Sequence, residues 1–275
     1  MKKITLIGAG GKMGLRLAHN LRKSSYATSY LEVNPLGIGK LADMGLAVSR
    51  PEACIGDADV LIFAVPDVAL GAVTGQYIPL MKSGAMALML DPAAPLAGKL
   101  HQRSDISYFI AHPAHPSIFY WGNTPEEQND HFGGIAAKQA IVCALMQGSD
   151  DDYTLGENLA SAFYAPVTKA HRITAEQMGL LEPALVETLS STCIYVIRQG
   201  LDEIIKRGVP ADAARDFLLG HLRIQLAVLF DEIPGAVFSD AANKALQRGL
   251  KEFIKDDWRK VFDPENVQDQ IASIT

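Results

Sequence analysis

The sequence predicts an α/β protein in which a doubly wound, mostly parallel sheet is followed by an all-α C-terminal domain. Over roughly the first two thirds of the 275 residues, short apolar runs of strand length alternate with helical patterns. The run at residues 60–65 shows no alternation of polar and apolar residues, which is typical of strands covered by helices on both faces. From Thr174 onward only amphipathic helical patterns follow. We therefore expect two domains, at residues 1–173 and 174–275.

The strand at residues 4–7 leads into a glycine-rich turn and then into a helix. The turn reads GAGGKMG, so its glycines have the spacing G-x-x-G-x-x-G rather than the more common G-x-G-x-x-G. Glycine lets the backbone approach a ligand closely, and the free N–H groups at the start of a helix attract anions. This pattern predicts a Rossmann-type domain that binds a dinucleotide pyrophosphate, with a purely structural turn as the alternative. The residues expected at the cofactor are Gly8, Gly10, Gly11, Lys12, Met13 and Gly14.

An acidic residue near the end of the second predicted strand, residues 26–33, indicates which cofactor binds. Glu32 lies where a dinucleotide-binding fold carries the carboxylate that accepts hydrogen bonds from the ribose hydroxyls. The same carboxylate would repel the 2′-phosphate of NADP, so NAD is the expected cofactor. A solvated carboxylate at a strand end is the alternative for Glu32.

The apolar strand at residues 60–65 is followed by the residues that we expect at the nicotinamide end of the cofactor. In parallel sheets ligands bind beyond the carboxyl ends of the strands. This places Ala64, Val65, Pro66 and Asp67 beside the nicotinamide nucleotide. Simple termination of the strand, with Asp67 capping the next helix, is the alternative.

Two histidines follow the next pair of predicted strands, residues 85–90 and 106–111. The segment HPAHP places His112 and His115 between prolines, directly after the second of these strands. A rigid segment on the ligand side of a sheet suits a catalytic or metal-binding group, so both histidines are candidate catalytic residues. The alternative is that the imidazoles only satisfy backbone groups of the loop. A polar and aromatic loop at residues 117–134 follows, either as a functional cover or as a solvated insertion.

The first domain ends with a strand at residues 138–146, a helix at 149–165 and a closing strand at 166–173. Lys169 and His171 lie near the end of this closing strand, where the two domains would meet. A lysine there could anchor a substrate carboxylate or act as a general acid, and a histidine could act as a base near neutral pH. Both are candidate catalytic residues, with surface positions at a strand end as the alternative.

The helical domain opens with a capping box at residues 174–177, and its first helix can extend to Arg207. Within this helix Glu182 precedes Pro183, and a proline inside a helix interrupts the hydrogen-bond ladder. Glu182 lies close to the buried stripe, where a carboxylate needs a metal ion, an imidazole or a substrate hydroxyl as its partner. It is therefore a candidate catalytic residue, with an interdomain hydrogen bond as the alternative. Helices at 211–230 and 239–257 follow, and pairing with a second copy makes a homodimer the expected assembly.

The composition bears on partners and compartment. Lys and Arg number 25 against 31 Asp and Glu, giving a net charge of −6, and no basic run is interleaved with aromatic residues. Nucleic acid is therefore not an expected partner. No uninterrupted apolar stretch approaches the roughly 18 residues of a membrane span, so no membrane is expected. The three cysteines are widely spaced and form no C-x-x-C, as for free thiols in a reducing cytoplasm.

The motifs together resemble a known superfamily. The segment IGAGGKMG, the strand ADVLIFAVPD and an all-helical second domain are similar to 6-phosphogluconate dehydrogenase, β-hydroxyacid dehydrogenases and prephenate dehydrogenase. The helix signature G-x-x-x-K-x-x-N of β-hydroxyacid dehydrogenases is absent, since Lys169 is followed by Ala170, His171 and Arg172. The segments AHPAHPSIF and QMGLLEPALVET resemble more closely the D-apionate oxidoisomerases of bacterial sugar-acid catabolism.

This resemblance implies a reaction and a set of ligands. The implied reaction is oxidation of the 2-hydroxyl of D-apionate by NAD with migration of the carboxylate to the neighbouring carbon, which gives 3-oxo-isoapionate. A divalent ion would activate the hydroxyl and the ketone, and His112 and Glu182 are its candidate ligands, with zinc favoured by the imidazole. Two alternatives stay open, a simple NAD(P)-dependent dehydrogenase of a hydroxy acid or sugar acid, and a non-catalytic NAD-binding redox sensor.

Overall fold

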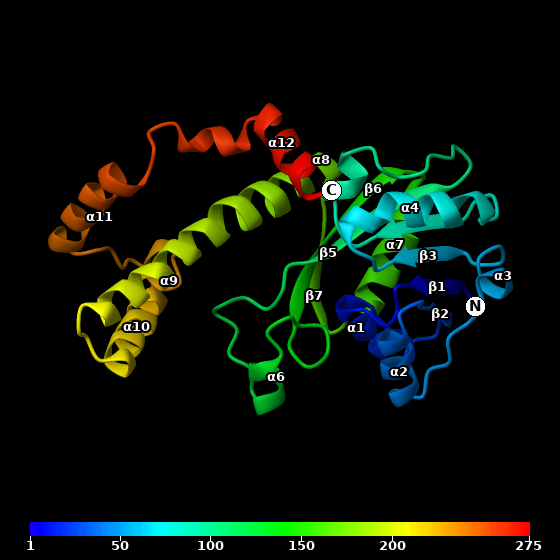
Figure 1. The fold of residues 1–275 in the computed structure, drawn as a ribbon, viewed down its shortest axis with the longest axis horizontal. Helices are drawn as coiled ribbons and strands as arrows, with labels where there is room; N and C mark the ends of the chain where they lie inside the picture. The colour runs from blue at the N-terminus through cyan, green and yellow to red at the C-terminus, as the bar shows by residue number, and fades with distance from the viewer. The chain divides into compact units, whose positions relative to one another are not determined.

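The computed structural model describes residues 1–275 and divides into two compact units (Figure 1). The first unit comprises Met1–Glu182 together with Gln268–Thr275, and the second comprises Pro183–Val267. The division therefore lies beyond Ile173, where the sequence pattern changes from mixed to helical. The cause is that Ala175 and Met178, which belong to the first helix after the sheet, are buried in the core of the first unit.

The first unit is built on one seven-stranded sheet in the order β2-β1-β3-β4-β5-β6-β7 (Figure 1). All neighbouring strands are parallel except β5 and β6, which are antiparallel. The mostly parallel, doubly wound sheet predicted from the sequence is thus confirmed. The strands are β1 Lys3–Ile7, β2 Ala27–Leu31, β3 Val60–Phe63, β4 Met86–Met89, β5 Ser107–Pro113, β6 Gln139–Gln147 and β7 Val167–Arg172.

Helices cover the sheet and enclose an apolar core on each face. Consecutive residues of β3 enter opposite cores, Leu61 and Phe63 on one face and Val60 and Ile62 on the other. This double burial is why the strand is apolar without alternation. The helices of this unit are α1 Lys12–Leu21, α2 Pro35–Asp43, α3 Pro51–Cys54, α4 Asp67–Tyr77, α5 Ala93–Leu96, α6 Pro125–Asn129, α7 Asp150–Phe163 and α8 Ala175–Gly179, with the 3₁₀ turn η1 Ile78–Leu80.

The helix that follows the sheet changes its geometry at the predicted proline. The expected capping box is formed, with the Thr174 hydroxyl accepting from the Gln177 N–H at 3.2 Å and the Gln177 side chain accepting from the Thr174 N–H at 3.0 Å. After α8 the chain continues as a π-helix, η2 Leu180–Ser190, which contains Pro183. A π-helix has wider turns than an α-helix and often marks a functional site. Glu182 lies in its first turn.

The second unit is helical and buries very little of itself. It contains α9 Ser191–Lys206, α10 Ala211–Leu229, α11 Asp240–Phe253 and the 3₁₀ turn η3 Trp258–Phe262, and α12 Pro264–Ile274 begins in it. The residues of this unit that are buried are Pro183, Ala184, Ala214 and Val267. Large apolar side chains such as Ile194, Tyr195 and Phe217 are more than half exposed.

One helical stretch has the length and composition of a membrane span. This stretch is Ala175–Lys206 and is 32 residues long. Within its most apolar 18-residue window, 11% of the residues are buried. The sequence pattern did not indicate it because Glu182 and Glu187 interrupt the apolar run. A single such helix is weak grounds for a membrane protein, because helices of soluble proteins also meet this criterion.

Candidate active site

The glycine turn between β1 and α1 is held tightly against two neighbouring strands. Gly8 has φ +76°, and a Cβ on it would lie 2.4 Å from the carbonyl oxygen of Ala64. Its N–H and that of Ala9 both donate to the Leu31 carbonyl at 3.0 Å. A Cβ on Gly14 would lie 2.1 Å from the Gly8 carbonyl oxygen. Gly8 and Gly14 therefore allow the turn to pack under α1, as the sequence pattern predicts.

The start of α1 offers unpaired backbone donors. Gly11 is the N-cap residue and provides no side-chain cap. The first intrahelical bond from this end joins the Leu15 N–H to the Gly11 carbonyl at 2.9 Å. The N–H groups of Lys12, Met13 and Gly14 precede it and are open to an anion at the positive end of the helix dipole.

Glu32 is fixed beside this turn by backbone donors. Its Oε2 accepts from the Gly10 N–H at 2.8 Å, and its Oε1 accepts from the N–H groups of Val33 and Asn34, each at 2.8 Å. A Cβ on Gly10 would lie 2.4 Å from the Cα of Gly37. Gly10, the additional glycine of the turn, is thus required by the close approach of α2. Oε2 accepts only one of these bonds and has capacity left for a ribose hydroxyl.

A cavity of about 420 Å³ lies at the carboxyl ends of β3, β4 and β5. It contains nine of the residues predicted from the sequence, namely Gly11, Lys12, Met13, Ala64, Val65, Pro66, His112, His115 and Glu182. The remaining lining residues are Leu90, Asp91, Pro113, Phe132 and Tyr164, which the sequence patterns did not single out as site residues. The cavity therefore brings the start of α1 together with the two histidines and with Glu182.

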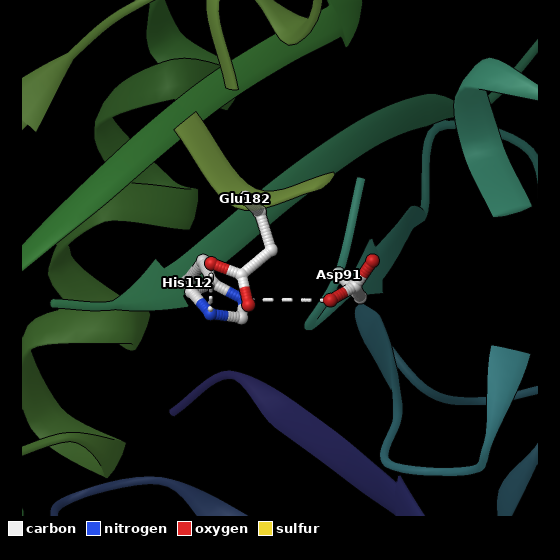
Figure 2. A group of neighbouring side chains, drawn as sticks. All are labelled: Asp91, His112 and Glu182. Carbon is white, nitrogen blue, oxygen red and sulfur yellow. Dashed lines mark ion pairs between the residues drawn. The ribbon is translucent and has the colours of Figure 1, made fainter. Parts of the chain in front are cut away.

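Three titratable side chains converge in this cavity, Asp91, His112 and Glu182 (Figure 2). Asp91 follows β4, His112 lies in β5 and Glu182 lies in η2. His112 Nε2 is 3.4 Å from Glu182 Oε2, and His112 Nδ1 is 3.8 Å from Asp91 Oδ2. One candidate ligand atom of each residue lies within 4.8 Å of the other two. Asp91 was missed because its signal, an acidic residue directly after a strand, is common in sheets of this kind.

The hydrogen bonding of His112 determines what its second nitrogen presents. Nδ1 lies 2.7 Å from the Leu90 carbonyl oxygen, which can only accept, so Nδ1 carries a proton. A neutral ring would then direct the lone pair of Nε2 at the Glu182 carboxylate, which is electrostatically unfavourable. The position between Nε2 and Glu182 therefore suits a proton or a metal cation.

A fourth carboxyl group lies next to this cluster. Asp67 is the first residue of α4, and burial together with the nearby Asp91 carboxylate raises the pKa of Asp67 to about 6. Asp67 is not among the cavity-lining residues. The place of Asp67 beside the nicotinamide stays a prediction. When ionised, its carboxylate adds to the negative electrostatic potential that favours a cation near Asp91.

His115 also lines the cavity, and it lies next to Phe132. It has φ +59°, and its Nδ1 is 2.9 Å from the Phe132 carbonyl oxygen. The His115 ring centroid is 5.7 Å from that of Phe132 and 6.5 Å from that of His112. Each histidine thus satisfies a backbone carbonyl and lines the cavity, so the two interpretations of the HPAHP segment are compatible.

The loop predicted at residues 117–134 reaches the cavity because α1 and Asp130 hold it. Asp130 forms an ion pair with Arg16, which also donates to the Gly133 carbonyl. The second carboxylate oxygen of Asp130 accepts from the N–H groups of residues 135–137 at 2.9–3.1 Å. These bonds lower the pKa of Asp130 despite its partial burial. Phe132 is thereby held as part of the cavity wall.

Lys169 and His171 are placed differently from the other candidates. Both lie on β7, an edge strand of the sheet, and both side chains are exposed. Neither lines the cavity that contains His112 and Glu182. The closing strand ends at the surface, so these two residues take no part in the site proposed below.

Comparison with known proteins identifies the family. The model of the family "Phosphogluconate dehydrogenase (decarboxylating) C-term" matches residues 120–275. A D-apionate oxidoisomerase of Cupriavidus necator is 50% identical over 275 residues, covering 100% of this chain and 99% of the relative. A D-apionate oxidoisomerase of Rhizobium rhizogenes is 47% identical over 276 residues, covering 100% of both chains. This chain belongs to the D-apionate oxidoisomerase family. Membership confirms the resemblance drawn from the motifs and the expectation of an NAD-dependent oxidoreductase.

A solved structure supports the fold at the same level of similarity. It is that of a semialdehyde dehydrogenase NAD-binding protein from Cupriavidus necator in complex with calcium and NAD. It is 50% identical, has a TM-score of 0.97 and matches over 100% of both chains. An NADH-preferring ketol-acid reductoisomerase from an uncultured archaeon shares the fold at 16% identity and a TM-score of 0.69, covering 99% of this chain and 85% of that one.

Proposed function

We propose that this chain is an NAD-dependent oxidoisomerase that converts D-apionate to 3-oxo-isoapionate. Family membership supports the substrate and the type of reaction. The observation that carries the proposal is the shared cavity, in which the open N–H groups of α1 and the His112–Glu182 pair lie together. A dinucleotide bound on the turn and along residues 64–66 would thus present its nicotinamide to the acid bound at His112.

The oxidation step requires a base close to the hydroxyl. The hydride leaves the 2-carbon for the nicotinamide ring, and the hydroxyl proton leaves for a basic atom of the enzyme. Without a metal ion His112 Nε2 can accept this proton, because Nδ1 is engaged with the Leu90 carbonyl and Glu182 stabilises the imidazolium that forms. With a cation on Nε2 this lone pair is occupied, and a carboxylate oxygen of Glu182 would accept the proton instead. In the second step a hydroxymethyl group migrates with its bonding electrons from the tertiary carbinol carbon to the adjacent ketone carbon, so that the tertiary alkoxide becomes a ketone and the former ketone becomes an alkoxide. The carboxylate, which is attached to the former ketone carbon, stays in place, so the expected migration is that of the hydroxymethyl group instead of the carboxylate.

A divalent ion fits the residues present. Asp91, His112 and Glu182 would supply one imidazole and two carboxylate ligands. Because Nδ1 of His112 donates to the Leu90 carbonyl, Nε2 of the neutral ring carries the lone pair that can bind the ion. Catalytic zinc usually has three protein ligands and keeps its fourth position open. A bound ion would lower the pKa of a substrate hydroxyl and polarise the ketone. The related Cupriavidus necator protein was solved with calcium, whereas the imidazole in this site favours zinc.

The test of the proposed function is the product formed from D-apionate and NAD. We expect NADH to appear with D-apionate, and carbon NMR of the product to show an altered carbon skeleton. A product with the original skeleton would assign the chain to the simple dehydrogenases. NAD binding without NADH formation from any of a panel of sugar acids would instead favour the redox sensor.

A homodimer is the assembly proposed for this enzyme. The second unit exposes apolar side chains along α9 and α10, and a hollow of about 890 Å³ there is lined largely by apolar residues such as Ile197, Leu201 and Phe217. The second unit, Pro183–Val267, buries too few side chains to form a stable core by itself. A second copy offers a self-complementary surface that covers these helices. Light scattering in detergent-free buffer tests the proposed homodimer. A monodisperse monomer would exclude the dimer, and a protein that stays in solution only with lipid would favour a membrane. A cytoplasmic location is proposed with it.

A further inference from the structure

We infer that the Lys12 ammonium binds the carboxylate of the acid substrate, and that Phe132 is the positioning residue that holds Lys12 for this role. The inference rests on the proposed function, because it names the group that recognises the acid in the same cavity. It differs from the expectation that Lys12 contributes to the site only as part of the pyrophosphate turn.

The charges that line the cavity show why such a group is needed. Asp91 and Glu182 present carboxylates, and His112 and His115 present imidazoles. Lys12 is the only lysine among the residues that line this cavity, and none of them is an arginine. A carboxylate that enters this cavity is repelled by Asp91 and Glu182 and attracted by Lys12. Lys12 therefore supplies the cationic side chain that can attract an acid here, in addition to any divalent ion held by Asp91, His112 and Glu182.

The Lys12 ammonium is available for this interaction. Its Nζ lies 3.7 Å from the centroid of the Phe132 ring, and it has no carboxylate partner in the structure. Arg16, one helical turn further along α1, is instead paired with Asp130. A cation over an aromatic face keeps its N–H donors for other acceptors, because the ring attracts the charge without accepting a conventional hydrogen bond.

The pyrophosphate of the cofactor does not require the Lys12 side chain. The backbone N–H groups of Lys12, Met13 and Gly14 are open at the start of α1, and the helix dipole adds to their attraction for an anion. Backbone donors and the lysine ammonium can therefore serve two different anions, the cofactor by the main chain and the substrate by the side chain.

Phe132 is fixed in place from two directions. The His115 ring contacts it edge-on and donates from Nδ1 to its carbonyl oxygen at 2.9 Å. Arg16 holds the residues on both sides, through Asp130 and the Gly133 carbonyl. Because Arg16 and Lys12 belong to the same helix, the aromatic ring and the ammonium keep their relative positions. The loop at residues 117–134 thus acquires a role in substrate binding.

The test compares an acid with its uncharged amide in Lys12→Gln, Lys12→Arg and the wild-type enzyme. We expect Lys12→Gln to raise the KM for D-apionate about 10- to 100-fold, as for loss of a charge-assisted hydrogen bond. The KM for D-apionamide should change less than about threefold, and Lys12→Arg should recover most of the loss for the acid. The Kd for NAD, measured by fluorescence, should stay within about twofold of wild type. Lys40→Gln, at an exposed position of α2, serves as the matched control.

Two results would overturn the inference. A weaker Kd for NAD that accounts for the whole loss of kcat/KM would assign Lys12 to the pyrophosphate. An equal loss for the acid and the amide would remove carboxylate recognition. If the wild-type enzyme forms no NADH with D-apionate, the proposed reaction is refuted but the role of Lys12 is not. Calorimetric binding of sugar acids to the enzyme–NADH complex then tests Lys12. The inference about Lys12 is refuted if an acid binds the wild-type enzyme and Lys12→Gln equally, or if no acid binds the wild-type enzyme.

A second pair of variants tests Phe132 separately. Phe132→Leu should raise the KM for the acid several-fold while kcat changes less than twofold, because the ammonium loses its platform but the reacting groups are untouched. Phe132→Tyr keeps an aromatic face and should restore the wild-type KM. A fall in kcat with unchanged KM, or no rescue by tyrosine, would show that Phe132 does not act through Lys12.

Discussion

His112 and Glu182 face each other across 3.4 Å, Nε2 to Oε2, although one lies in a strand of the sheet and the other in a π-helix. The contact depends on the protonated Nδ1 of His112, which donates to the Leu90 carbonyl and so directs Nε2 at the carboxylate. The pair lies within the cavity that also contains the start of α1. Removing either partner should therefore affect chemistry more than cofactor binding.

Substitution of this pair should reduce kcat strongly. We expect His112→Gln to lower kcat about 10²- to 10⁴-fold, the usual contribution of a general base, and Glu182→Gln to lower it by a similar order. The double variant should be little slower than the slower single variant, because the two groups act as a unit. Steady-state NADH formation measures these effects, and multiplicative losses would show that the residues act independently.

Metal removal should separate the two candidate reactions. We expect dialysis against a chelator to abolish the rearranged product, and zinc or another divalent ion to restore it. Asp91→Asn should weaken metal affinity at least tenfold, as loss of a charged ligand does. Metal content by mass spectrometry and product analysis by NMR check this prediction. An enzyme that rearranges its substrate fully after exhaustive chelation would rule out the metal.

The Asp67 carboxyl should make stability depend on pH. Its pKa is raised from 3.8 to about 6 in the folded chain, so the folded state binds its proton more tightly than the unfolded state does. Stability contributed by the protonated group is therefore lost as pH rises from about 4 to about 6. Allowing for its partial exposure, we expect Asp67→Asn to stabilise the cofactor-free protein by about 1 kcal/mol at pH 8. That corresponds to an increase in Tm of about 2–4 °C.

The pH series provides the control for Asp67. The difference in Tm between Asp67→Asn and wild type should vanish near pH 4, where the wild-type carboxyl is protonated in the folded chain. A difference of the same size at pH 4 and pH 8 would attribute the effect to packing instead of ionisation.

Glu32 should influence both the cofactor preference and the stability of the turn. Glu32→Ala removes three backbone hydrogen bonds at 2.8 Å, so we expect a loss of about 1–3 kcal/mol in stability. It also removes the charge that repels a 2′-phosphate, so the preference for NAD over NADP should fall about tenfold or more. Thermal melting and the ratio of kcat/KM for the two cofactors measure the two effects. Unchanged discrimination would leave Glu32 with the structural role alone.

The elements that depend on local patterns could be predicted from neighbouring residues alone. The apolar strands, the glycine turn and the capping box at Thr174 are encoded within a few neighbouring residues, and each appears close to its predicted place. The family resemblance likewise followed from short segments such as AHPAHPSIF. Local backbone preference and burial on both strand faces are sufficient to produce such signals.

Which candidate residues lie together depends on long-range packing and could not be predicted from local patterns. Asp91 and Phe132 enter the cavity because strand order and the Arg16–Asp130 ion pair bring distant segments to it, whereas Lys169 and His171 are left on an exposed edge strand. The approach of Gly37 explains why the additional position, Gly10, must be glycine, and its place at the cofactor stays a prediction. A sequence pattern reflects the needs of one element, whereas contacts between elements depend on how the elements pack. These contacts bring together His112, Glu182 and Lys12, the residues proposed for the site.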